Sequence, residues 1–321
     1  MMKAAIRHEY CSPDKLEIGQ VPLPSPGDDE ILVKVKATTV NRPDCAVLTG
    51  KPWAIRLFIG LFKPTRLITG TDFAGIVVDM GSEVDQFEIG DHVYGFFDQG
   101  LCSHAEYVAV STKKAVLKKP YNVTFEQAAA SLEGAHHAFY FIKGLKLNAG
   151  DQILINGGTG AIGNAAIQFL NHYKVRVTAT CPTDFTEVLK SLGVERLIDY
   201  QKEDFTKINE QFDYVFDAVG KSSFKKCKPL LKSKGVYISS ELGKNWENLF
   251  FALLSPFMKD KKVKFPIPLS AKPSMEFINK LVLNGEFIPL IDRRYRLEDI
   301  SAAYQYVLSG QKKGNVVITF D

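Results

Sequence analysis

A glycine-rich turn in the middle of the chain has the residue types and spacing of a dinucleotide-binding site. Its glycines are Gly158, Gly160 and Gly163, with an apolar run at 153–155 before them and a helical pattern at 161–173 after them. The spacing requires this order of strand, turn and helix. We expect the first glycine to permit the tight turn, the second to let the backbone approach a pyrophosphate, and the third to let the helix pack on the strand. The N–H groups and the positive dipole of the helix N-terminus would then attract the anion.

The segments that follow favour this interpretation over an ordinary loop. Strands are predicted over 175–180, 196–199, 214–219 and 236–240, and helices over 185–192 and 222–231. Strands that alternate with helices of about ten residues are typical of a parallel, doubly wound sheet. We therefore predict a Rossmann-type α/β domain over 122–262. The cofactor-binding residues expected in its turn are Gly158, Thr159, Gly160, Ala161, Ile162 and Gly163.

The chain before and after that domain is predicted to be rich in β-strands. Short runs such as 30–37 and 75–79 are separated by turn residues, which is typical of a mostly antiparallel, barrel-like domain. The chain turns β-rich again near its end, with a last strand over 315–320. We expect the end to fold back onto the first domain, so that this domain comprises 1–121 and 263–321.

The composition is that of a globular protein. With 321 residues, the chain can form two domains, each with its own core. Its hydrophobic content of 45% and charged content of 24% are ordinary. The net charge of +4 is spread along the sequence, so we predict no nucleic-acid partner. Because we find no signal pattern and no apolar run long enough to span a membrane, we expect a cytoplasmic protein.

The cysteines and histidines form no metal-binding pattern. The five cysteines lie far apart and form no CxxC pair, which opposes structural zinc and favours reduced thiols. His136 and His137 are adjacent, so on a helix they point in different directions and cannot act as ligands four residues apart. We predict no metal site.

Further motifs give the chain a resemblance to a known superfamily over nearly its whole length. Besides the glycine turn, they are Thr39-Val-Asn-Arg-Pro-Asp44, Gly70-Thr-Asp-Phe-Ala-Gly75, Gly90-Asp-His-Val-Tyr-Gly95, Ile198-Asp-Tyr200, Phe216-Asp-Ala-Val-Gly220 and Gly314-Asn-Val-Val-Ile318. With these motifs the chain resembles a medium-chain dehydrogenase/reductase of the zinc-free quinone oxidoreductase type. The resemblance implies a GroES-like catalytic domain beside the Rossmann domain and an NAD(P)H-dependent reductase activity. We also expect a homodimer.

Two positions separate the chain from the zinc enzymes that it resembles. Those enzymes carry a cysteine where Asn41 stands and a histidine where Thr71 stands. An amide and a hydroxyl cannot replace a thiolate and an imidazole around zinc. Without a Lewis acid, a simple alcohol has no ready route to an alkoxide at neutral pH. The sequence therefore favours hydride transfer to a small, hydrophobic, electron-poor acceptor, either a quinone or an α,β-unsaturated carbonyl.

Three residues are candidates for the chemistry. By resemblance, Asn41 is the substrate-side asparagine, whose amide could donate to the oxygen that gains charge, although it could instead serve only its own loop. Asp44 belongs to the same motif and could simply fix the loop that presents Asn41. His137 stands where relatives often have a threonine beside the nicotinamide. It could deliver a proton or only pack within its helix. The aromatic residue that many relatives carry is replaced by Ala46.

The residues after the second Rossmann strand indicate NADPH. Sites that prefer NAD have an acid at the end of this strand, whereas none stands in the first positions after Thr180. Thr183 could donate to the 2′-phosphate, and Tyr200 matches a residue that meets the phosphate in relatives. Asp184 would repel that phosphate, so NADH remains possible. Thr180 and Gly220 complete the predicted cofactor-binding set.

Two apolar segments, 53–62 and 246–258, have no role in the glycine turn. Their helical spacing predicts burial in a core or in a dimer. The alternative is a position at the mouth of the cleft, where an apolar lining would suit a hydrophobic carbonyl substrate.

Two other functions are left open. One is an alcohol dehydrogenase of the same superfamily, which Asn41 and Thr71 oppose. The other is a non-catalytic, NADPH-binding structural or regulatory protein, because a nucleotide site alone does not prove turnover.

Overall fold

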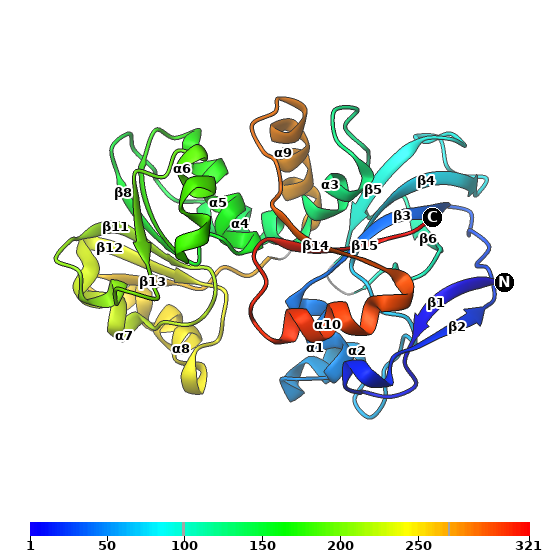
Figure 1. Ribbon diagram of the computed structural model, residues 1–321, viewed down its shortest axis with the longest axis horizontal. Coiled ribbons are helices and arrows are strands. Elements are labelled where there is room, and N and C mark those ends of the chain that lie inside the picture. The colour runs from blue at the N-terminus through cyan, green and yellow to red at the C-terminus, as the bar shows by residue number, and fades with distance from the viewer. Residues whose placement is uncertain (98–99, 269) are drawn as a thin grey trace. The chain divides into compact units, whose positions relative to one another are not determined.

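The computed structural model describes residues 1–97, 100–268 and 270–321, and the chain divides into two compact units (Figure 1). The discontinuous unit comprises Met1–Glu133 and Ser270–Asp321, and the central unit comprises Gly134–Leu269. The first boundary between the two units follows Glu133, whereas the sequence placed it after residue 121. It lies later because helix α3 (Phe125–Ala130) packs on the sheet of the discontinuous unit.

A parallel sheet forms the centre of the central unit, as predicted. In the described residues its six strands run in the order β10-β9-β8-β11-β12-β13, and all neighbouring strands are parallel. They are β8 (Gln152–Asn156), β9 (Arg176–Cys181), β10 (Arg196–Asp199), β11 (Phe212–Asp217), β12 (Leu231–Ser239) and β13 (Lys262–Lys264). Ile153, Leu154 and Ile155 are fully buried in β8, as expected where helices cover both faces of a sheet. The sequence did not predict β13.

Helices precede and connect these strands (Figure 1, green and yellow). The helix before the sheet, α4 (Glu133–Ile142), begins at the last residue of the first segment of the discontinuous unit. The others are α5 (Ala161–Asn171), α6 (Thr186–Ser191), α7 (Phe224–Cys227) and α8 (Glu247–Leu254). The predicted alternation of strands and helices is confirmed, with shorter helices at α6 and α7 than the sequence suggested.

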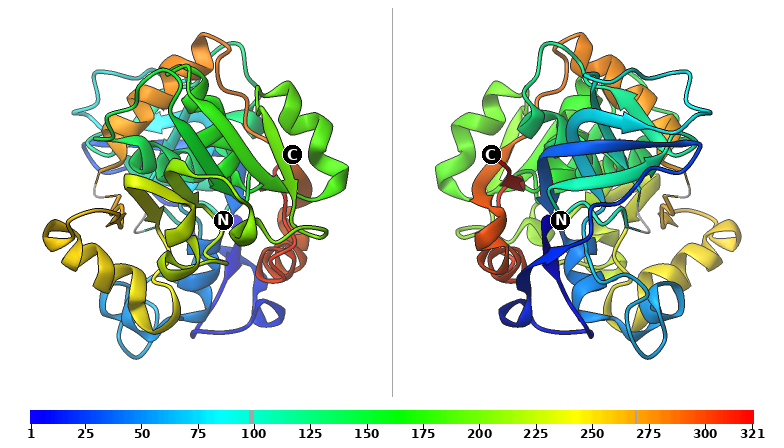
Figure 2. Two further views of the ribbon diagram at one scale, coloured as in Figure 1. Left: turned by 90° about the vertical axis from the view of Figure 1, so that its left-hand side faces the viewer. Right: turned by 90° about the vertical axis from the view of Figure 1, so that its right-hand side faces the viewer.

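The discontinuous unit is built on a mostly antiparallel sheet, as predicted. In the described residues the strand order is β14-β15-β3-β4-β5-β7, β6 also pairs with β3, and only β14 and β15 are parallel. The strands are β3 (Glu30–Val40), β4 (Asp72–Met80), β5 (His92–Phe96), β6 (Tyr107–Ser111), β7 (Ala115–Lys118), β14 (Ile291–Arg296) and β15 (Asn315–Thr319). Because β15 pairs with β3, the end of the chain does return to the first domain. A separate pair, β1 (Met2–Ile6) and β2 (Glu17–Val21), lies at the lower edge of this unit (Figure 2, dark blue).

Five helices belong to the described part of the discontinuous unit: α1 (Arg42–Thr49), α2 (Arg56–Ile59), α3, α9 (Ala271–Leu283) and α10 (Ile300–Leu308). Two of them, α3 and α10, pack on β3. Helix α1 lies beside α10 (Figure 1), and a core of buried side chains that includes Val40, Leu48 and Tyr304 fills the space around them. Residue 41 is therefore held at a buried junction between a strand and a helix.

The two apolar segments are only partly buried, because Ile59 is buried and Phe251 packs against the core of the central unit while other large apolar side chains are exposed. Phe58 is 84% exposed and Phe62 is 90% exposed, and in the other segment Phe257 is 84% exposed. The expected core burial is therefore wrong for these side chains, because an apolar periodicity shows that a helix has an apolar face but not what covers it. Among the described residues, the helices are all too short or too polar to cross a membrane.

Candidate functional site

The glycine turn joins the end of β8 to the start of α5. Gly157 has a φ of +91°, which side-chain-bearing residues rarely adopt, and a Cβ there would lie 2.3 Å from Val219 Cγ1. The tight-turn role that the spacing assigned to Gly158 therefore belongs to Gly157. A Cβ on Gly163 would lie 2.2 Å from the carbonyl oxygen of Gly157, so this glycine lets the helix approach the turn.

The N-terminus of α5 leaves room for a ligand at Gly160. This residue is the N-cap with a φ of −69°, and the nearest neighbour of an added Cβ would be 3.4 Å away. The first N–H groups of a helix have no acceptor within the helix, and the helix dipole makes this end attractive to phosphate. Thr159, Ala161 and Ile162 flank Gly160 at this end. The turn thus fits a pyrophosphate in shape and in charge.

A buried carboxylate that the sequence analysis did not select, Asp217, ties the turn to β11. Its Oδ1 accepts from Asn156 Nδ2 (2.9 Å) and Gly220 N (3.1 Å), and its Oδ2 accepts from Ser222 N (3.0 Å) and Tyr237 Oη (3.0 Å). Four donors satisfy a carboxylate that has no exposed surface. The order of the strands reverses between β8 and β11, and ligands bind at such a switch point in doubly wound sheets.

Thr180 and Gly220, both expected at the cofactor, lie where they support the turn. Thr180 is fully buried, and its hydroxyl accepts from Gly157 N (2.8 Å) and donates to Asn156 Oδ1 (3.0 Å). Gly220 has a φ of +64°, and a Cβ there would lie 2.3 Å from Glu241 Cγ. The hydroxyl of Thr180 is thus already occupied by the turn that it holds.

An acid missed in the sequence, Asp199, stands at the end of β10 beside one of the residues predicted to bind the 2′-phosphate. The Thr183 hydroxyl donates to Asp199 Oδ2, Gln201 N donates to Oδ1 (3.0 Å), and Lys202 Nζ lies 3.3 Å from Oδ2. These donors, with Thr183 first, lower the pKa of Asp199. The hydroxyl expected to meet a phosphate therefore binds a carboxylate of this chain instead.

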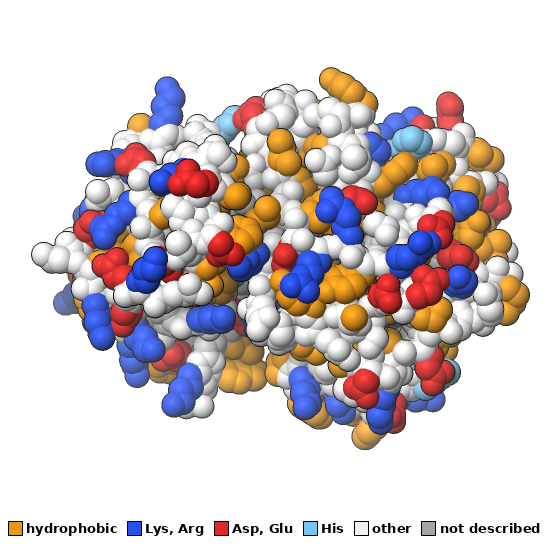
Figure 3. Space-filling view, in the orientation of Figure 1, with side chains coloured by type: hydrophobic (Ala, Val, Ile, Leu, Met, Phe, Trp, Pro, Cys, Tyr) orange, Lys and Arg blue, Asp and Glu red, His pale blue; other side chains and the backbone are white. Residues whose placement is uncertain are grey.

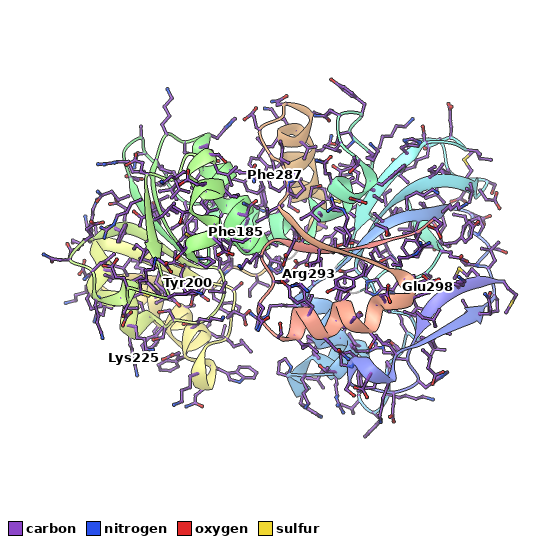
Figure 4. All side chains as sticks on the ribbon, viewed as in Figure 1. Phe185, Tyr200, Lys225, Phe287, Arg293 and Glu298 are labelled. Atoms are coloured by element: carbon purple, nitrogen blue, oxygen red, sulfur yellow. The ribbon has the colours of Figure 1, made fainter. Side chains whose placement is uncertain are left out.

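Figure 4 labels two side chains of the same region, Phe185 and Tyr200. Tyr200 follows β10 directly and is 51% exposed, so its phenol is accessible to a ligand. Phe185 ends the short turn 183–185 after β9, which also carries Asp184. This region thus combines an accessible phenol with two carboxylates, those of Asp184 and Asp199.

Asn41 lies at the junction of β3 and α1 and is 1% exposed. Its Nδ2 donates to Thr39 Oγ1 (2.5 Å), and its Oδ1 accepts from Lys312 Nζ (3.3 Å). Since an amide nitrogen carries two hydrogens, one N–H donor of Asn41 is left over within the described part of the chain. This donor is the one that a substrate oxygen could use.

Lys312 is a functional candidate that sequence reasoning missed. It comes from the loop before β15, and its ammonium group also donates to Gly314 O (3.1 Å). Burial lowers the pKa of Lys312, while the nearby carboxylate of Glu133 raises it. The adjacent lysines 312 and 313 were visible in the sequence, but nothing there linked them to Asn41, which lies 271 positions earlier.

The buried carboxylate of Asp72 fixes the opposite side of Asn41. Its Oδ1 accepts from Thr39 N (2.7 Å) and Thr38 Oγ1 (3.1 Å), and its Oδ2 accepts from the Thr39 hydroxyl. Because Thr39 Oγ1 donates its only hydrogen to Asp72, it must accept from Asn41, which directs the amide nitrogen to Thr39 and the amide oxygen to Lys312. Burial raises the pKa of Asp72 to about 7, although the hydrogen bonds from Thr39 and Thr38 lower it.

Asp44 holds the main chain of Asn41. Its Oδ2 accepts from Asn41 N (2.8 Å), while its Oδ1 and Thr71 Oγ1 are buried and have no hydrogen-bond partner among the described residues. Burial and the neighbouring charge of Asp72 raise the pKa of Asp44 well above its ordinary value. Asp44 therefore has the position of a residue that orients Asn41.

His104 supports the same strand end as a neutral ring. Its Nε2 lies 2.9 Å from the carbonyl oxygen of Thr39 and must donate to it, so its Nδ1 accepts from Thr69 Oγ1 (2.8 Å). Tyr304 Oη donates to the same Thr69 hydroxyl (2.8 Å). Burial lowers the pKa of His104 to about 4, which keeps the ring uncharged near neutral pH.

The side chains around Asn41 do not suit zinc. Zinc is bound in proteins by thiolate, imidazole and carboxylate groups, whereas Asn41 and Thr71 offer an amide and a hydroxyl. In the described ranges, no group of three or more His, Cys, Asp and Glu residues could hold a metal ion.

His137 lies on α4 of the central unit and is partly exposed. Its ring meets the ring of fully buried His136 edge-on, with centroids 5.7 Å apart, and His136 in turn meets Tyr140 at 5.2 Å. As expected for adjacent residues of a helix, the two histidines point in different directions.

Two family models match the chain. The alcohol dehydrogenase GroES-like domain matches residues 27–123, and the zinc-binding dehydrogenase domain matches residues 192–318. The first match falls within the discontinuous unit. The second match covers parts of both units.

Individual proteins match over almost the whole chain. The 2-methylene-furan-3-one reductase of Solanum lycopersicum is 30% identical over 329 aligned positions, which cover 99% of this chain and 79% of that protein. The NADPH-dependent alkenal/one oxidoreductase of Arabidopsis thaliana is 28% identical with the same coverage. The solved structure of the quinone oxidoreductase from Coxiella burnetii has a TM-score of 0.86 and 26% identity, and the match covers 100% of this chain and 99% of that one.

We predict that Asp72 makes the stability of the protein depend on pH. A carboxyl whose pKa is raised to about 7 in the folded state binds a proton that the unfolded chain, with a pKa near 4, has released. Its contribution to the free energy of unfolding therefore falls by up to ~1.4 kcal/mol per pH unit as the pH rises from about 4 to about 7. Asp72→Asn removes this titration. The free energy of unfolding of the variant should therefore rise relative to that of the wild type between about pH 4 and about pH 7, and the difference should stay constant above about pH 7.

Urea denaturation at a series of pH values measures this difference. Asp79→Asn, on the exposed face of the same strand, is the matched control and should give a difference that does not vary with pH. A constant difference between wild type and Asp72→Asn over the whole range would mean that Asp72 stays ionised in the fold.

Proposed function

The chain belongs to the medium-chain dehydrogenase/reductase superfamily, in its quinone oxidoreductase type, and from this membership we propose that it transfers hydride from NADPH to a quinone or an α,β-unsaturated carbonyl without zinc. It is an NAD(P)H-dependent oxidoreductase. The names of its relatives, which reduce a methylene-furanone, alkenals and enones, or quinones, support this class of acceptor. The observation that carries the proposal is the buried Asn41 amide, which contacts Lys312 where zinc enzymes would have a ligand.

The oxygen of the acceptor is the atom that needs stabilisation. When bound, the reduced nicotinamide supplies a hydride to the electron-poor carbon, and negative charge develops on the carbonyl oxygen. The remaining N–H of Asn41 donates to this oxygen. Lys312, at the amide oxygen, polarises the amide and so strengthens that donor. Since Thr39 and Asp44 already hold Asn41, little reorientation is needed during the reaction.

The reduced acceptor must also gain a proton. We assign its delivery to His137, whose imidazole is a general acid of the appropriate kind near neutral pH. We propose that Asp44 positions Asn41 and that Lys312 acts electrostatically through the amide group of Asn41. The ammonium group of Lys312 is the competing proton source, because it contacts the amide oxygen of Asn41.

The cofactor site of this proposal lies in the central unit. Gly157, Gly160 and Gly163 form the turn that holds the pyrophosphate, and Tyr200 meets the adenosine side. A modest preference for NADPH follows from the missing acid at the end of β9. The carboxylate of Asp199, next to Thr183, limits that preference because it repels a 2′-phosphate.

A homodimer in the cytoplasm completes the proposal. Helix α8 exposes Phe250 and Leu253, and the turn 255–257 after it exposes Phe257. Obligate interfaces between identical chains are rich in such apolar side chains. Sedimentation equilibrium of the purified protein gives the number of chains directly.

We predict that the purified protein oxidises NADPH when small quinones or enones are supplied. Chelators should leave the rate unchanged, and elemental analysis should give far less than one zinc per chain, because Asn41 and Thr71 are not zinc ligands. The protein would instead be an alcohol dehydrogenase if it contains about one zinc per chain and oxidises alcohols, and if a chelator removes both the zinc and this activity. Tight NADPH binding with no turnover of any acceptor would identify a non-catalytic protein.

Asp199→Asn should raise the ratio of kcat/KM with NADPH to kcat/KM with NADH. Removing a negative charge from beside a 2′-phosphate weakens the repulsion of that phosphate, so we expect the ratio to rise roughly several-fold. Glu203→Gln, an exposed acid in the following loop, is the control and should change the ratio little. If NADH is at least as good a donor as NADPH for the wild type, the proposed preference is wrong.

The pH dependence of turnover should separate His137 from Lys312. A general acid loses its effect as the pH rises through its pKa. His137→Thr should therefore remove one inflection from the pH profile of kcat and lower kcat by ~10²-fold or more. Lys312→Met should lower kcat at every pH and keep the inflection.

Fluorescence titration with NADPH is the control for both variants, which should bind the cofactor as the wild type does. Superimposable pH profiles of wild type and His137→Thr would show that His137 does not deliver the proton and only packs within its helix. Loss of the inflection in Lys312→Met would instead identify Lys312 as the proton donor.

A further inference from the structure

An exposed apolar segment of the discontinuous unit takes no part in the site described above. We call residues 51–67 the α2 segment, since they include the short turn 53–55 and helix α2. Six of its large apolar side chains are between 41% and 90% exposed: Trp53, Leu57, Phe58, Leu61, Phe62 and Leu67. Monomeric soluble proteins rarely leave so many large apolar side chains together on their surface.

The body of the unit holds the α2 segment in a fixed shape. Arg56 Nε donates to Gly50 O (3.1 Å), and its guanidinium lies 4.3 Å from the centroid of the Tyr10 ring. The Tyr10 hydroxyl donates to Gly60 O, and Thr65 N donates to Ile59 O (2.9 Å). An ordered loop therefore presents the exposed side chains, so little conformational entropy is lost when they bind a partner.

Burial alternates along this loop in a way that directs its aromatic side chains outward. Ile59 is 9% exposed and Pro64 is buried, whereas Phe58 and Phe62, on either side of Ile59, are 84% and 90% exposed. The buried residues anchor the loop, and the two phenylalanines protrude from it. Protruding rings suit insertion into a soft surface better than packing in a preformed groove.

The charge of the segment is of one sign. No acidic residue stands between Asp44 and Asp72, while the stretch contains four cations: Lys51, Arg56, Lys63 and Arg66. The two arginines bind backbone oxygens of the protein. Lys51 and Lys63 are exposed and have no carboxylate partner among the residues described. Hydrophobic and basic side chains are among those along the lower edge of this unit in Figure 3.

The combination of exposed apolar and basic side chains in the α2 segment favours a lipid surface over a protein partner. Protein interfaces are depleted of lysine in their cores. Segments that lie in a membrane interface instead combine Trp, Phe and Leu with Lys and Arg, and anionic lipids attract the cations. The α2 segment has both parts of this pattern within a few residues.

We propose that the α2 segment docks the protein reversibly on the surface of an anionic lipid bilayer. Phe58 and Phe62 enter the boundary between headgroups and acyl chains, and Lys51 and Lys63 contact lipid phosphates. Since no helix in the described residues can span a bilayer, the contact is peripheral. The inference rests on the surface alone and does not depend on the proposed reaction, although hydrophobic quinones dissolve in such a bilayer.

Co-sedimentation of the full chain with vesicles tests the proposal. Vesicles of phosphatidylcholine mixed with phosphatidylglycerol should bind the protein, and pure phosphatidylcholine should bind it much less. The binding should weaken as salt screens the charges. Phe58→Ser with Phe62→Ser should reduce the affinity at least about tenfold. Lys51→Gln with Lys63→Gln should reduce it by a similar factor on the anionic vesicles only.

Tyr121→Ser is the matched control, because Tyr121 is an aromatic residue of the same unit that is 88% exposed outside the segment. This control should bind vesicles as the wild type does, and an unchanged circular dichroism spectrum and unfolding midpoint show that each variant is folded. The proposal is wrong if the wild type does not sediment with anionic vesicles at low salt, or if the two double variants bind like the wild type. It is also wrong if the phenylalanine variant turns a dimer into monomers while vesicle binding is unchanged, since the occupant would then be a second copy of the chain.

Discussion

The hydrogen bond between Thr39 and Asp72 sets the direction of the polar group at the centre of the site. Thr39 donates its one hydroxyl hydrogen to the carboxylate of Asp72, so its oxygen can only accept from Asn41. The amide nitrogen of Asn41 therefore faces Thr39, and the amide oxygen faces Lys312. Burying a carboxylate is costly unless donors surround it, and Asp72 has three. The fold thus retains a buried carboxyl group, and with it one defined orientation of Asn41.

The central unit contains a similar arrangement at Asp217. This carboxylate, at the end of β11, accepts one hydrogen bond from the end of β8, one from β12 and two from the loop after β11. It therefore keeps the two strand ends in register at the point where the strand order reverses. In each unit the sheet supplies a rigid edge, and a buried acid orients groups that we propose to meet a ligand there.

The sequence predicted what depends on local pattern and missed what depends on distant contacts. Strands β8 to β12 of the parallel sheet and the helix-packing role of Gly163 follow from periodicity and spacing. Gly157 was missed because its need for a positive φ arises in the folded turn, where Val219 closes around it. Lys312 and Asp199 were missed because their partners are set by the fold. Burial in a core or in a dimer was predicted for the apolar α2 segment, and the core is excluded for its exposed side chains. Periodicity shows that a helix has an apolar face but not what covers it.

The central claim is that Lys312 acts on the reaction through the amide of Asn41. A double-mutant cycle of Asn41→Ala and Lys312→Met, measured as kcat/KM with one enone acceptor, tests it most directly. If the two residues act as one unit, the double variant should be about as slow as the slower single variant, with a coupling energy of at least ~1 kcal/mol. Effects that simply add in the double variant would contradict the claim, because each residue would then act independently of the other.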